Sequence, residues 1–372
     1  MYYFDHSATT PLLPEIAELM SNINKEVYGN PSSIYSLGRK SRNIIEAARS
    51  QVAQSISAKP DQVIFTSGGT ESNNQVFWSL LNSRRNHIVS NVIEHPAVVK
   101  VLQFLNQFGL IHDLVGVDAD GIVSIDKIAN AILPETALIS IMLANNEIGT
   151  LQPVKEIVEI ANKRGVLVHT DAVQCLGKME LDVIDLGVDF LSLSAHKFYG
   201  PKGIGALYVK EPKILPSLII GGGQERDRRA GTENISAIAG MGLAAENSIK
   251  SLTKKVNTLL SLEEKFKKGL NKFYKNAILN GDQSKKLPGL LNISFPGTKS
   301  SVLMKKLDRE GISVSNGSAC GSGDIKPSPV LSAIGLDDIT NLSTLRFSFG
   351  SSNTNDQIDY LLSKLESMLS EI

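Results

Sequence analysis

Short apolar runs alternate with amphipathic helical segments along most of this 372-residue chain. Runs such as 137–143, 166–170 and 188–193 have the length and the β-branched content of buried strands. The segments between them, 154–164 for example, carry apolar residues at helical spacing. Strands that alternate with helices in this way favour a parallel, doubly wound sheet. In such a sheet, ligands bind in the crevice at the carboxyl ends of the strands.

The alternation gives way to a long, lysine-rich helical segment near 247–276. Beyond it we expect two strands and two helices, at 290–295, 345–349, 301–309 and 356–372. This change of pattern predicts two domains. The large domain would hold residues 15–250, and a smaller α+β domain would hold residues 251–372 together with the N-terminal residues 1–14.

Composition and charge exclude several classes of protein. Lys+Arg and Asp+Glu both number 38, so the chain has no electrostatic case for direct nucleic-acid binding or a polybasic membrane patch. Its apolar runs are far shorter than the roughly 20 residues of a spanning helix. The first residues lack the charge and hydrophobicity of a signal peptide. The two cysteines, Cys175 and Cys320, form no disulfide framework, and we expect a reducing cytoplasmic location.

One lysine, Lys197, closely follows the apolar run 188–193, in the sequence Ser-Ala-His-Lys. Lysines are almost never fully buried without a partner. A buried lysine has a lowered pKa and becomes a nucleophilic amine, which Schiff-base chemistry requires. The alternative is a solvated lysine in a surface turn. The run alone does not decide between the two.

Further polar side chains follow other expected strands and would meet Lys197 at one sheet edge: Thr70, Asn146, Asp171, Gln174, Ser194 and His196. Each has a structural alternative. Thr70 could be only a helix cap, Asp171 a cap or an arginine partner, and Asn146 a turn residue. His95 could be a buried core histidine. Together, a helix start that can bind phosphate, a carboxylate and a lysine make the donor set of a pyridoxal phosphate site.

An ordered series of short motifs runs nearly from end to end. They are Asp-His-Ser-Ala-Thr-Thr at 5–10, Asn-Pro-Ser-Ser at 30–33, Thr-Ser-Gly-Gly-Thr-Glu-Ser-Asn-Asn at 66–74, Glu-His at 94–95, Asn-Asn-Glu-Ile-Gly at 145–149, His-Thr-Asp-Ala-Val-Gln at 169–174, Ser-Ala-His-Lys at 194–197, Gly-Gly-Gly-Gln-Glu-Arg at 221–226, Arg-Ala-Gly-Thr at 229–232, Gly-Ser-Ala-Cys at 317–320 and Arg-Phe-Ser at 346–348. In this series the chain resembles the NifS/IscS-type cysteine desulfurases, class V members of the fold-type I pyridoxal phosphate enzymes. The resemblance implies an α/β fold with a mainly parallel seven-stranded sheet flanked by helices, a smaller α+β C-terminal domain, and a homodimer.

The resemblance assigns catalytic roles to five positions. Lys197 would carry pyridoxal phosphate as a Schiff base and then serve as the base for the substrate's α-proton. His95 would stack on the cofactor ring and assist proton transfer. Asn146 and Arg346 would bind the carboxylate of L-cysteine, and a planar guanidinium suits that task. Cys320, in a mobile loop at 315–326, would attack the substrate sulfur, release L-alanine and keep a persulfide.

The resemblance also assigns the remaining contacts of the cofactor. Asp171 would pair with the ring nitrogen and Gln174 with the ring hydroxyl. The phosphate would be held by Gly69, Thr70, Ser194, His196 and, from the other subunit, Thr232. Asn146 would also lie against the cofactor.

Several alternatives stay open. The sulfur acceptor could be an iron–sulfur scaffold or a tRNA-thiolation protein. No metal site is assigned, although Cys320 could transiently bind an iron–sulfur cluster or could be an inert loop thiol. Cys175 reads as a structural residue. Another class V reaction, such as selenocysteine lyase or aminotransferase chemistry, and a non-catalytic scaffold for iron–sulfur assembly are the competing functions.

The chain departs from the family pattern at three places. Tyr35 stands where the family often has histidine, and Asp227 stands where glycine is common. Residues 298–301, Thr-Lys-Ser-Ser, replace an acidic segment. None of these changes removes a group with a catalytic role, but the last could alter how partners dock.

Overall fold

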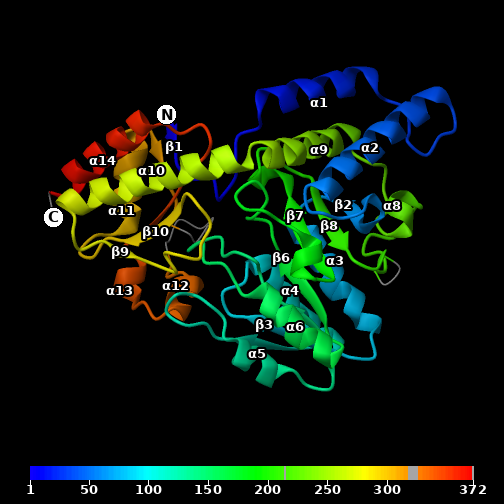
Figure 1. The fold of residues 1–372 in the computed structure, drawn as a ribbon, viewed down its shortest axis with the longest axis horizontal. Helices are drawn as coiled ribbons and strands as arrows, with labels where there is room; N and C mark the ends of the chain where they lie inside the picture. Colours follow the sequence, from blue (N-terminus) through cyan, green and yellow to red (C-terminus); the bar gives the residue numbers. More distant parts are fainter. Residues whose placement is uncertain (213–214, 317–325, 371–372) are drawn as a thin grey trace.

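Seven strands form the central sheet of the computed structural model, which describes residues 1–212, 215–316 and 326–370 (Figure 1). Across the sheet they are β2 (Val63–Thr66), β8 (Gly205–Val209), β7 (Phe190–Ser194), β6 (Leu167–Asp171), β5 (Thr136–Ser140), β3 (His87–Asn91) and β4 (Ile111–Val115). The strands from β7 to β4 are all parallel, and β8 runs antiparallel to both of its neighbours. The predicted mainly parallel, seven-stranded sheet is confirmed.

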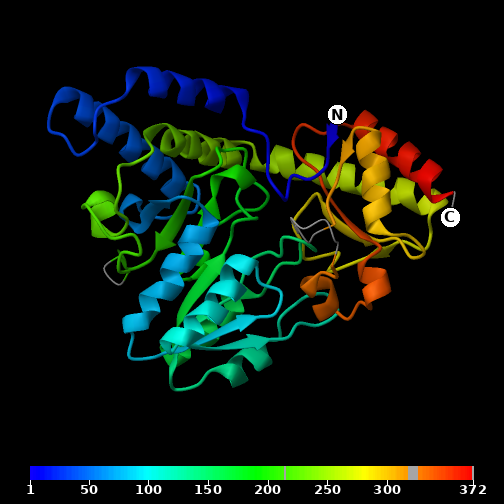
Figure 2. The same ribbon diagram turned by 180° about the vertical axis from the view of Figure 1, so that it is seen from behind.

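Helices cover both faces of this sheet. One face packs against α2 (Ser36–Gln54), α6 (Val154–Arg164) and α9 (Ile235–Lys250). The other packs against α3 (Gly69–Trp78) and α4 (Pro96–Leu105), which lie in front of the sheet when the molecule is seen from behind (Figure 2). The strands are buried on both sides, which explains why they appear in the sequence as continuous apolar runs and not as alternating patterns.

Shorter elements complete the half of the molecule that is built on the seven-stranded sheet. They are α5 (Ile125–Ala131), α7 (Val183–Leu186), α8 (Gln224–Asp227), and the 3₁₀ turns η1 (Pro60–Gln62), η2 (Ser79–Asn82), η3 (Asn106–Phe108) and η4 (Ala195–Lys197). Helix α1 (Pro14–Glu26) packs on α9 at the outer edge (Figure 1).

A second core lies in the other half of the molecule, where both termini also lie (Figure 1). Its antiparallel sheet has the order β12 (Thr344–Ser348), β10 (Leu290–Ser294) and β9 (Ile278–Leu279). Three helices bury their apolar faces with it: α10 (Leu252–Phe273), α11 (Ser300–Arg309) and α14 (Asn355–Leu369). Two short helices, α12 (Pro329–Ala333) and α13 (Asp338–Asn341), follow in the chain.

The N-terminus belongs to this second core. Strand β1 (Tyr2–Tyr3) pairs in parallel with β11 (Ile312–Ser313), and the Phe4 ring is buried with α10 and β12. Thr10, six residues later, donates its backbone N–H to the carbonyl of His196, which follows strand β7 of the seven-stranded sheet. The first residues therefore run from one core to the other. The predicted boundaries of the two domains stay a prediction.

The helical segment expected over 247–276 is interrupted. Helix α9 ends at Lys250 and α10 begins at Leu252. Between them, the Ser251 hydroxyl donates to the carbonyl of Asn247 at 2.7 Å. A serine that bonds back to its own helix in this way weakens and bends the helix. Within the described ranges, no helix has both the length and the apolar character needed to cross a membrane.

The turn around α8 holds three consecutive non-glycine residues with positive φ: Glu225 at 48°, Arg226 at 58° and Asp227 at 65°. This left-handed conformation costs roughly 1–2 kcal/mol per residue because Cβ approaches the carbonyl oxygen. A buried ion pair holds the turn. The Glu225 carboxylate accepts from Arg49 Nη1 at 2.6 Å and Nη2 at 2.8 Å, and from the Phe65 backbone N–H at 2.9 Å.

Replacing Asp227 with glycine should therefore stabilise the protein by up to about 1 kcal/mol, because glycine adopts positive φ without steric cost. The midpoint of urea unfolding would rise. Asp227→Ala is the matched control, since it removes the same carboxylate but keeps Cβ, and it should lower the midpoint. Equal midpoints for the two variants would show that the turn stores no backbone strain.

Candidate active site

The site is built on the end of strand β7. All five residues of the strand are buried, and the chain then makes the single 3₁₀ turn η4, which ends at Lys197. Gly200 allows this turn to close, because a Cβ there would lie 2.9 Å from the Cβ of Ala195. Lys197 is thereby placed just beyond the carboxyl end of a parallel strand, as predicted.

The Lys197 ammonium is covered by the N-terminal segment. Its Nζ donates to the backbone carbonyls of Ser7 at 2.6 Å and Ala8 at 2.8 Å. Burial lowers the pKa of Lys197 to about 7, and the nearby charge of Lys178 adds to the effect. Because the pKa lies near neutrality, a large share of this amine is uncharged and nucleophilic at physiological pH.

The start of α3 lies beside the end of β7. Gly205 of β8 lets them meet, since a Cβ there would lie 2.6 Å from the Cα of Gly68. A Cβ on Gly69 would lie 3.8 Å from that of Ser194 and would clash with Val173. Gly68 supplies no side-chain cap to the first amides of α3. These amides and the helix dipole face the region of Ser194 and make an anion site.

Asp171 ends strand β6, the neighbour of β7. Its Oδ2 accepts from Asn73 Nδ2 at 2.7 Å, and its Oδ1 accepts from the backbone N–H of Val173 at 3.0 Å. The two bonds fix the direction of the carboxylate while each oxygen keeps a free lone pair. Asp171 is thus an oriented acceptor and not a helix cap.

His95 forms the N-cap of α4. Its Nδ1 accepts from the Ala97 backbone N–H at 3.1 Å, which assigns the single proton of the neutral ring to Nε2. Burial lowers the pKa of His95; the Asp171 charge opposes this shift and the Lys197 charge adds to it. The ring is therefore neutral near pH 7 and can donate a hydrogen bond from Nε2.

Gln174 and His196 both contact the N-terminal segment. Gln174 Nε2 donates to the Ser7 carbonyl at 2.9 Å, and His196 Nδ1 lies 3.1 Å from Thr9 Oγ1. Burial, together with the Lys197 charge, lowers the pKa of His196 to about 4, so this ring is also neutral. The segment thus forms one wall of the site.

Arg346 reaches the site from β12 of the second core. Its Nη1 donates to the Asn146 carbonyl at 2.9 Å and its Nη2 to Asp5 Oδ1 at 2.7 Å. Its Nε is buried without a hydrogen-bond partner in the described part of the chain. A buried guanidinium with an unused N–H is a donor available to a carboxylate.

Cys320 lies outside the described residues. The chain on either side is anchored near Arg346. The backbone of Ser315 exchanges two hydrogen bonds with that of Arg346, at 3.2 and 2.6 Å. On the other side, Ser328 Oγ donates to Glu147 Oε2 at 2.6 Å. Cys175, by contrast, is completely buried, and burial strongly raises the pKa of its thiol. It is an unreactive core residue in a turn.

Two predicted phosphate ligands, Thr70 and Thr232, form no side-chain hydrogen bond to the described residues around Lys197, which we call the Lys197 cluster. Thr70 is exposed at the start of α3, and Thr232 is exposed beyond the turn around α8. Within the described residues, neither hydroxyl has a hydrogen bond to the Lys197 cluster. The roles of Thr70 and Thr232, the latter in another subunit, stay predictions.

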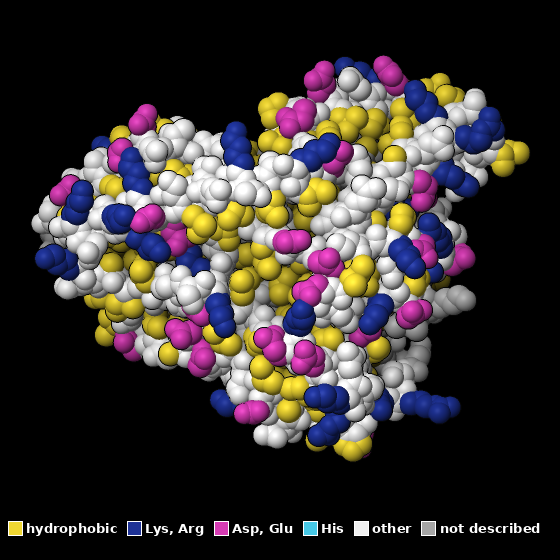
Figure 3. Space-filling model, viewed as in Figure 1, with side chains coloured by type: hydrophobic (Ala, Val, Ile, Leu, Met, Phe, Trp, Pro, Cys, Tyr) yellow, Lys and Arg dark blue, Asp and Glu magenta, His cyan; other side chains and the backbone are white. Residues whose placement is uncertain are grey.

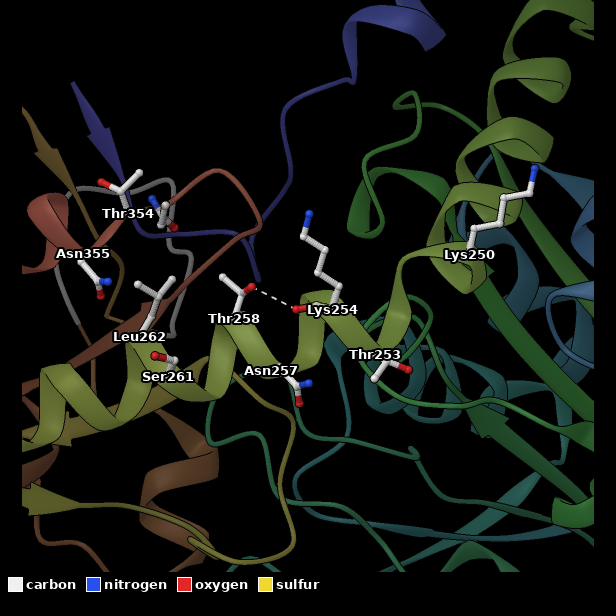
Figure 4. Close-up of a pocket in the computed structure, with 10 residues that line it drawn as sticks. Lys250, Thr253, Lys254, Asn257, Thr258, Ser261, Leu262, Thr354 and Asn355 are labelled. Atoms are coloured by element: carbon white, nitrogen blue, oxygen red, sulfur yellow. Dashed lines mark hydrogen bonds between the residues drawn. The ribbon is translucent and has the colours of Figure 1, made fainter.

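A surface hollow of about 920 Å³ lies elsewhere, along α10 and the start of α14. Figure 4 shows its polar lining, with Thr258 Oγ1 donating to the carbonyl of Lys254 at 3.0 Å. The lining contains no carboxylate and none of the strand-end residues. Its size alone does not make it the reactive site, because the lysines and histidines whose pKa values are lowered by burial and by one another's charge, Lys178, His95, His196 and Lys197, lie around the end of β7.

Sequence reasoning missed the supporting residues. Asp5 and Ser7 were noted only as part of a motif, yet they contact Arg346 and Lys197. Asn73 orients Asp171. Lys178, four residues after Gln174, donates to Gln174 Oε1. The four-residue spacing was the only available signal for Lys178, and nothing local distinguishes the others.

The residues present fit pyridoxal phosphate. An uncapped helix start can take a phosphate, and the Ser194 hydroxyl beside it has no hydrogen-bond partner among the described residues. Asp171 is oriented as an acceptor for a protonated ring nitrogen, and Lys197 is an amine of lowered pKa. These are the groups that this cofactor requires of a protein.

Comparisons with known proteins agree with this geometry. The family model for class-V aminotransferases matches residues 2–361. Cysteine desulfurase IscS of Dictyoglomus turgidum is 43% identical over 373 residues, covering 100% of this chain and 95% of the relative. The IscS of Methanosarcina thermophila is 43% identical over 363 residues, covering 97% and 90%.

Solved structures show the same likeness. A NifS-like protein superposes with a TM-score of 0.94 at 35% identity, with 100% of both chains covered. The structure of SspA in complex with cysteine has a TM-score of 0.84 at 33% identity, covering 95% of this chain and 100% of the other.

Proposed function

The chain belongs to the class-V aminotransferase family and is a pyridoxal phosphate-dependent cysteine desulfurase, and from that premise we propose how its residues divide the reaction. The substrate is L-cysteine and the products are L-alanine and a persulfide on Cys320. The observation that carries the assignment of roles is Lys197, an amine with a pKa of about 7 beside the oriented Asp171 carboxylate.

Binding of the substrate uses Arg346. Its buried Nε is an unused donor, and Asp5 and the Asn146 carbonyl hold the guanidinium in place. A carboxylate at this edge fixes the amino acid in one orientation. The solved SspA complex with cysteine supports this substrate, because SspA shares the fold of this chain.

Proton transfer uses Lys197 and His95. When bound, pyridoxal phosphate supplies an electron sink that weakens bonds at the substrate's α-carbon. Gly69, Thr70, Ser194, His196 and Gln174 would hold the cofactor, with Asp171 at the ring nitrogen. Lys197, uncharged near neutral pH, accepts the α-proton. His95 stays neutral and donates from Nε2.

Sulfur transfer uses Cys320. Its thiolate attacks the substrate sulfur, the carbon–sulfur bond breaks, and the sulfur remains on Cys320 as a persulfide. Ser315 and Ser328 anchor the chain on both sides next to Arg346 and Glu147. The persulfide then passes to an acceptor protein, an iron–sulfur scaffold or a tRNA-thiolation protein. The reaction takes place in the cytoplasm.

A homodimer would complete the site. Thr232 is exposed and would reach the phosphate bound by the other subunit. Apolar side chains are exposed around the turn between α1 and α2, including Ile34 at 89% and Tyr28 at 75%. Figure 3 shows further hydrophobic side chains gathered under α1, between that helix and α9. Exposed apolar surface of this kind marks an interface, and we assign it to a second copy.

Replacing Cys320 with serine tests this function. The purified variant should keep the absorbance of the bound cofactor and its affinity for L-cysteine, because Cys320 has no proposed part in either. Persulfide on the protein, measured by mass spectrometry after one turnover, should disappear, and alanine release should fall by at least about 100-fold.

The matched control is Cys175→Ser, which removes the other thiol and should leave persulfide formation intact in the folded protein. Alanine formation by Cys320→Ser at the native rate would contradict the proposed sulfur transfer. Selenide released in preference to sulfide, or amino transfer to a keto acid, would instead indicate one of the other class V reactions.

A further inference from the structure

A second lysine lies in the interior next to the site. Lys178 follows β6 in the turn after Gln174, and the residue is buried, with 9% of its surface exposed. Its Nζ donates to Gln174 Oε1 at 3.1 Å, its one hydrogen bond in the described part of the chain. Within that same part, no carboxylate lies within 4.0 Å of Lys178 Nζ. Burial lowers the pKa of Lys178 to about 8, so most of these side chains are still charged near pH 7. A buried ammonium without a paired anion is costly, so its retention calls for a reason.

The hydrogen bond fixes the orientation of the Gln174 amide. Because Lys178 has only donors, the atom facing it must be the amide oxygen. The amide nitrogen is then directed to the other side, where Nε2 donates to the Ser7 carbonyl at 2.9 Å. Its second N–H remains for the cofactor. Without Lys178 the amide could rotate by half a turn and present its oxygen instead.

The same chain of contacts continues to Lys197. The Ser7 carbonyl that accepts from Gln174 also accepts from Lys197 Nζ at 2.6 Å. Lys178, Gln174, the Ser7 carbonyl and Lys197 therefore form one continuous line. A small cavity lined by His6, Lys178 and Lys197 lies alongside it.

The charges that face Lys197 come from several elements. Positive charges are carried by Lys178 from the turn after β6 and Arg346 from β12, and negative charges by Asp171 of β6 and Asp5 of the N-terminal segment. His95, the N-cap of α4, and His196 of η4 also interact with it, and both are neutral near pH 7. Lys255 of α10 and the neutral His6 face Lys178.

We propose that Lys178 is a positioning residue of this active site, which orients the Gln174 amide for the cofactor and sets a buried positive charge beside Lys197. This inference rests on the proposed role of Lys197. The positive charge makes the protonated form of Lys197 less favourable and so keeps the amine uncharged at lower pH. Lys178 therefore has two effects: its hydrogen bond orients Gln174, and its charge acts on Lys197. Different substitutions remove one effect or both.

The test measures the titration of Lys197 itself. In the full-length protein freed of cofactor, trace acetylation with acetic anhydride at a series of pH values, read by mass spectrometry of the Lys197 peptide, gives the midpoint. For the native protein we expect a midpoint near 7. A midpoint near the ordinary lysine value of about 10.4 would overturn the proposal without any variant.

Variants separate the two effects. Lys178→Met and Lys178→Gln both remove the charge, and each should raise the Lys197 midpoint by roughly one pH unit. Lys178→Gln keeps an amide N–H that can donate to Gln174, and it takes the place of the methionine variant in the test if that variant does not fold. Lys178→Arg keeps charge and donor and should restore the native midpoint. Gln174→Met keeps the Lys178 charge, so the midpoint should stay near native while the spectrum of the bound cofactor changes.

The control is Lys202→Met, which removes an exposed lysine close to Lys197 in the chain and should leave the midpoint unchanged. A native midpoint in both neutral Lys178 variants would overturn the proposal and reduce Lys178 to a packing residue. Failure of the proposed function looks different: the native protein would then bind pyridoxal phosphate without a change in absorbance, whatever the residue at 178.

Discussion

Lys197→Ala should lose the absorbance of covalently held pyridoxal phosphate and should lower kcat/KM for L-cysteine by at least about 1,000-fold. The substitution removes the amine that anchors the cofactor and the base that accepts the α-proton, and positioned bases alone contribute roughly 10²–10⁴-fold. The Ala8 carbonyl would lose the donor that Nζ supplies, while the Ser7 carbonyl would keep only its bond from Gln174 Nε2. Absorbance and alanine formation are measured on the same preparation.

Lys202→Ala is the comparison for this variant. It removes a second lysine, five residues further along the chain, but Lys202 is exposed and has no hydrogen bond or ion pair to the N-terminal segment among the described residues. Its absorbance and activity should match those of the native protein. Activity within tenfold of native in Lys197→Ala would place the catalytic amine at another residue.

Arg49→Met should lower the free energy of unfolding by roughly 3–5 kcal/mol, because it leaves the Glu225 carboxylate buried without its partner. Both side chains of the pair are at most 5% exposed, and their contact is bidentate. The loss should also release the strained turn at 225–227. Equilibrium unfolding in urea measures the change.

The double variant Arg49→Met/Glu225→Met is the control. It removes both charges, so most of the loss should be regained, since a matched hydrophobic pair often replaces a buried ion pair without cost. If the double variant were as unstable as Arg49→Met, the loss would have to come from packing, for example of Arg49 over the Phe65 ring.

The fold could be predicted where the sequence has strong local patterns. The helix at 154–164 was predicted to the residue, and strand β6, expected at 166–170, was predicted to within one residue. The helix has one apolar stripe at helical spacing, and the strand is a continuous apolar run because both of its faces are buried. The pattern of hydrophobic residues is therefore enough to identify both elements. Strand β4 was missed, because it lies at the edge of the sheet and Ile111 is 57% exposed.

The candidate site divides in a similar way. Lys197, Asp171 and Ser194 each stand at the end of an apolar run, and the rule that parallel strands present their carboxyl ends at one edge brings them together. Lys178 and Asp5 do not stand at the end of an apolar run, so this rule does not place them in the site. Their importance depends on distances between segments, which composition and periodicity do not contain.

By itself the sequence determined the family and the reaction, and it predicted which lysine is reactive, because these depend on residue types in a fixed order along the chain. Only the tertiary structure decided what surrounds that lysine. It laid the carbonyls of Ser7 and Ala8 over Lys197 and brought Arg346 across from the second core. It also buried the unpaired charge of Lys178 nearby. The physical reason is that a pKa depends on burial and on charges through space, and segments far apart in the sequence supply both.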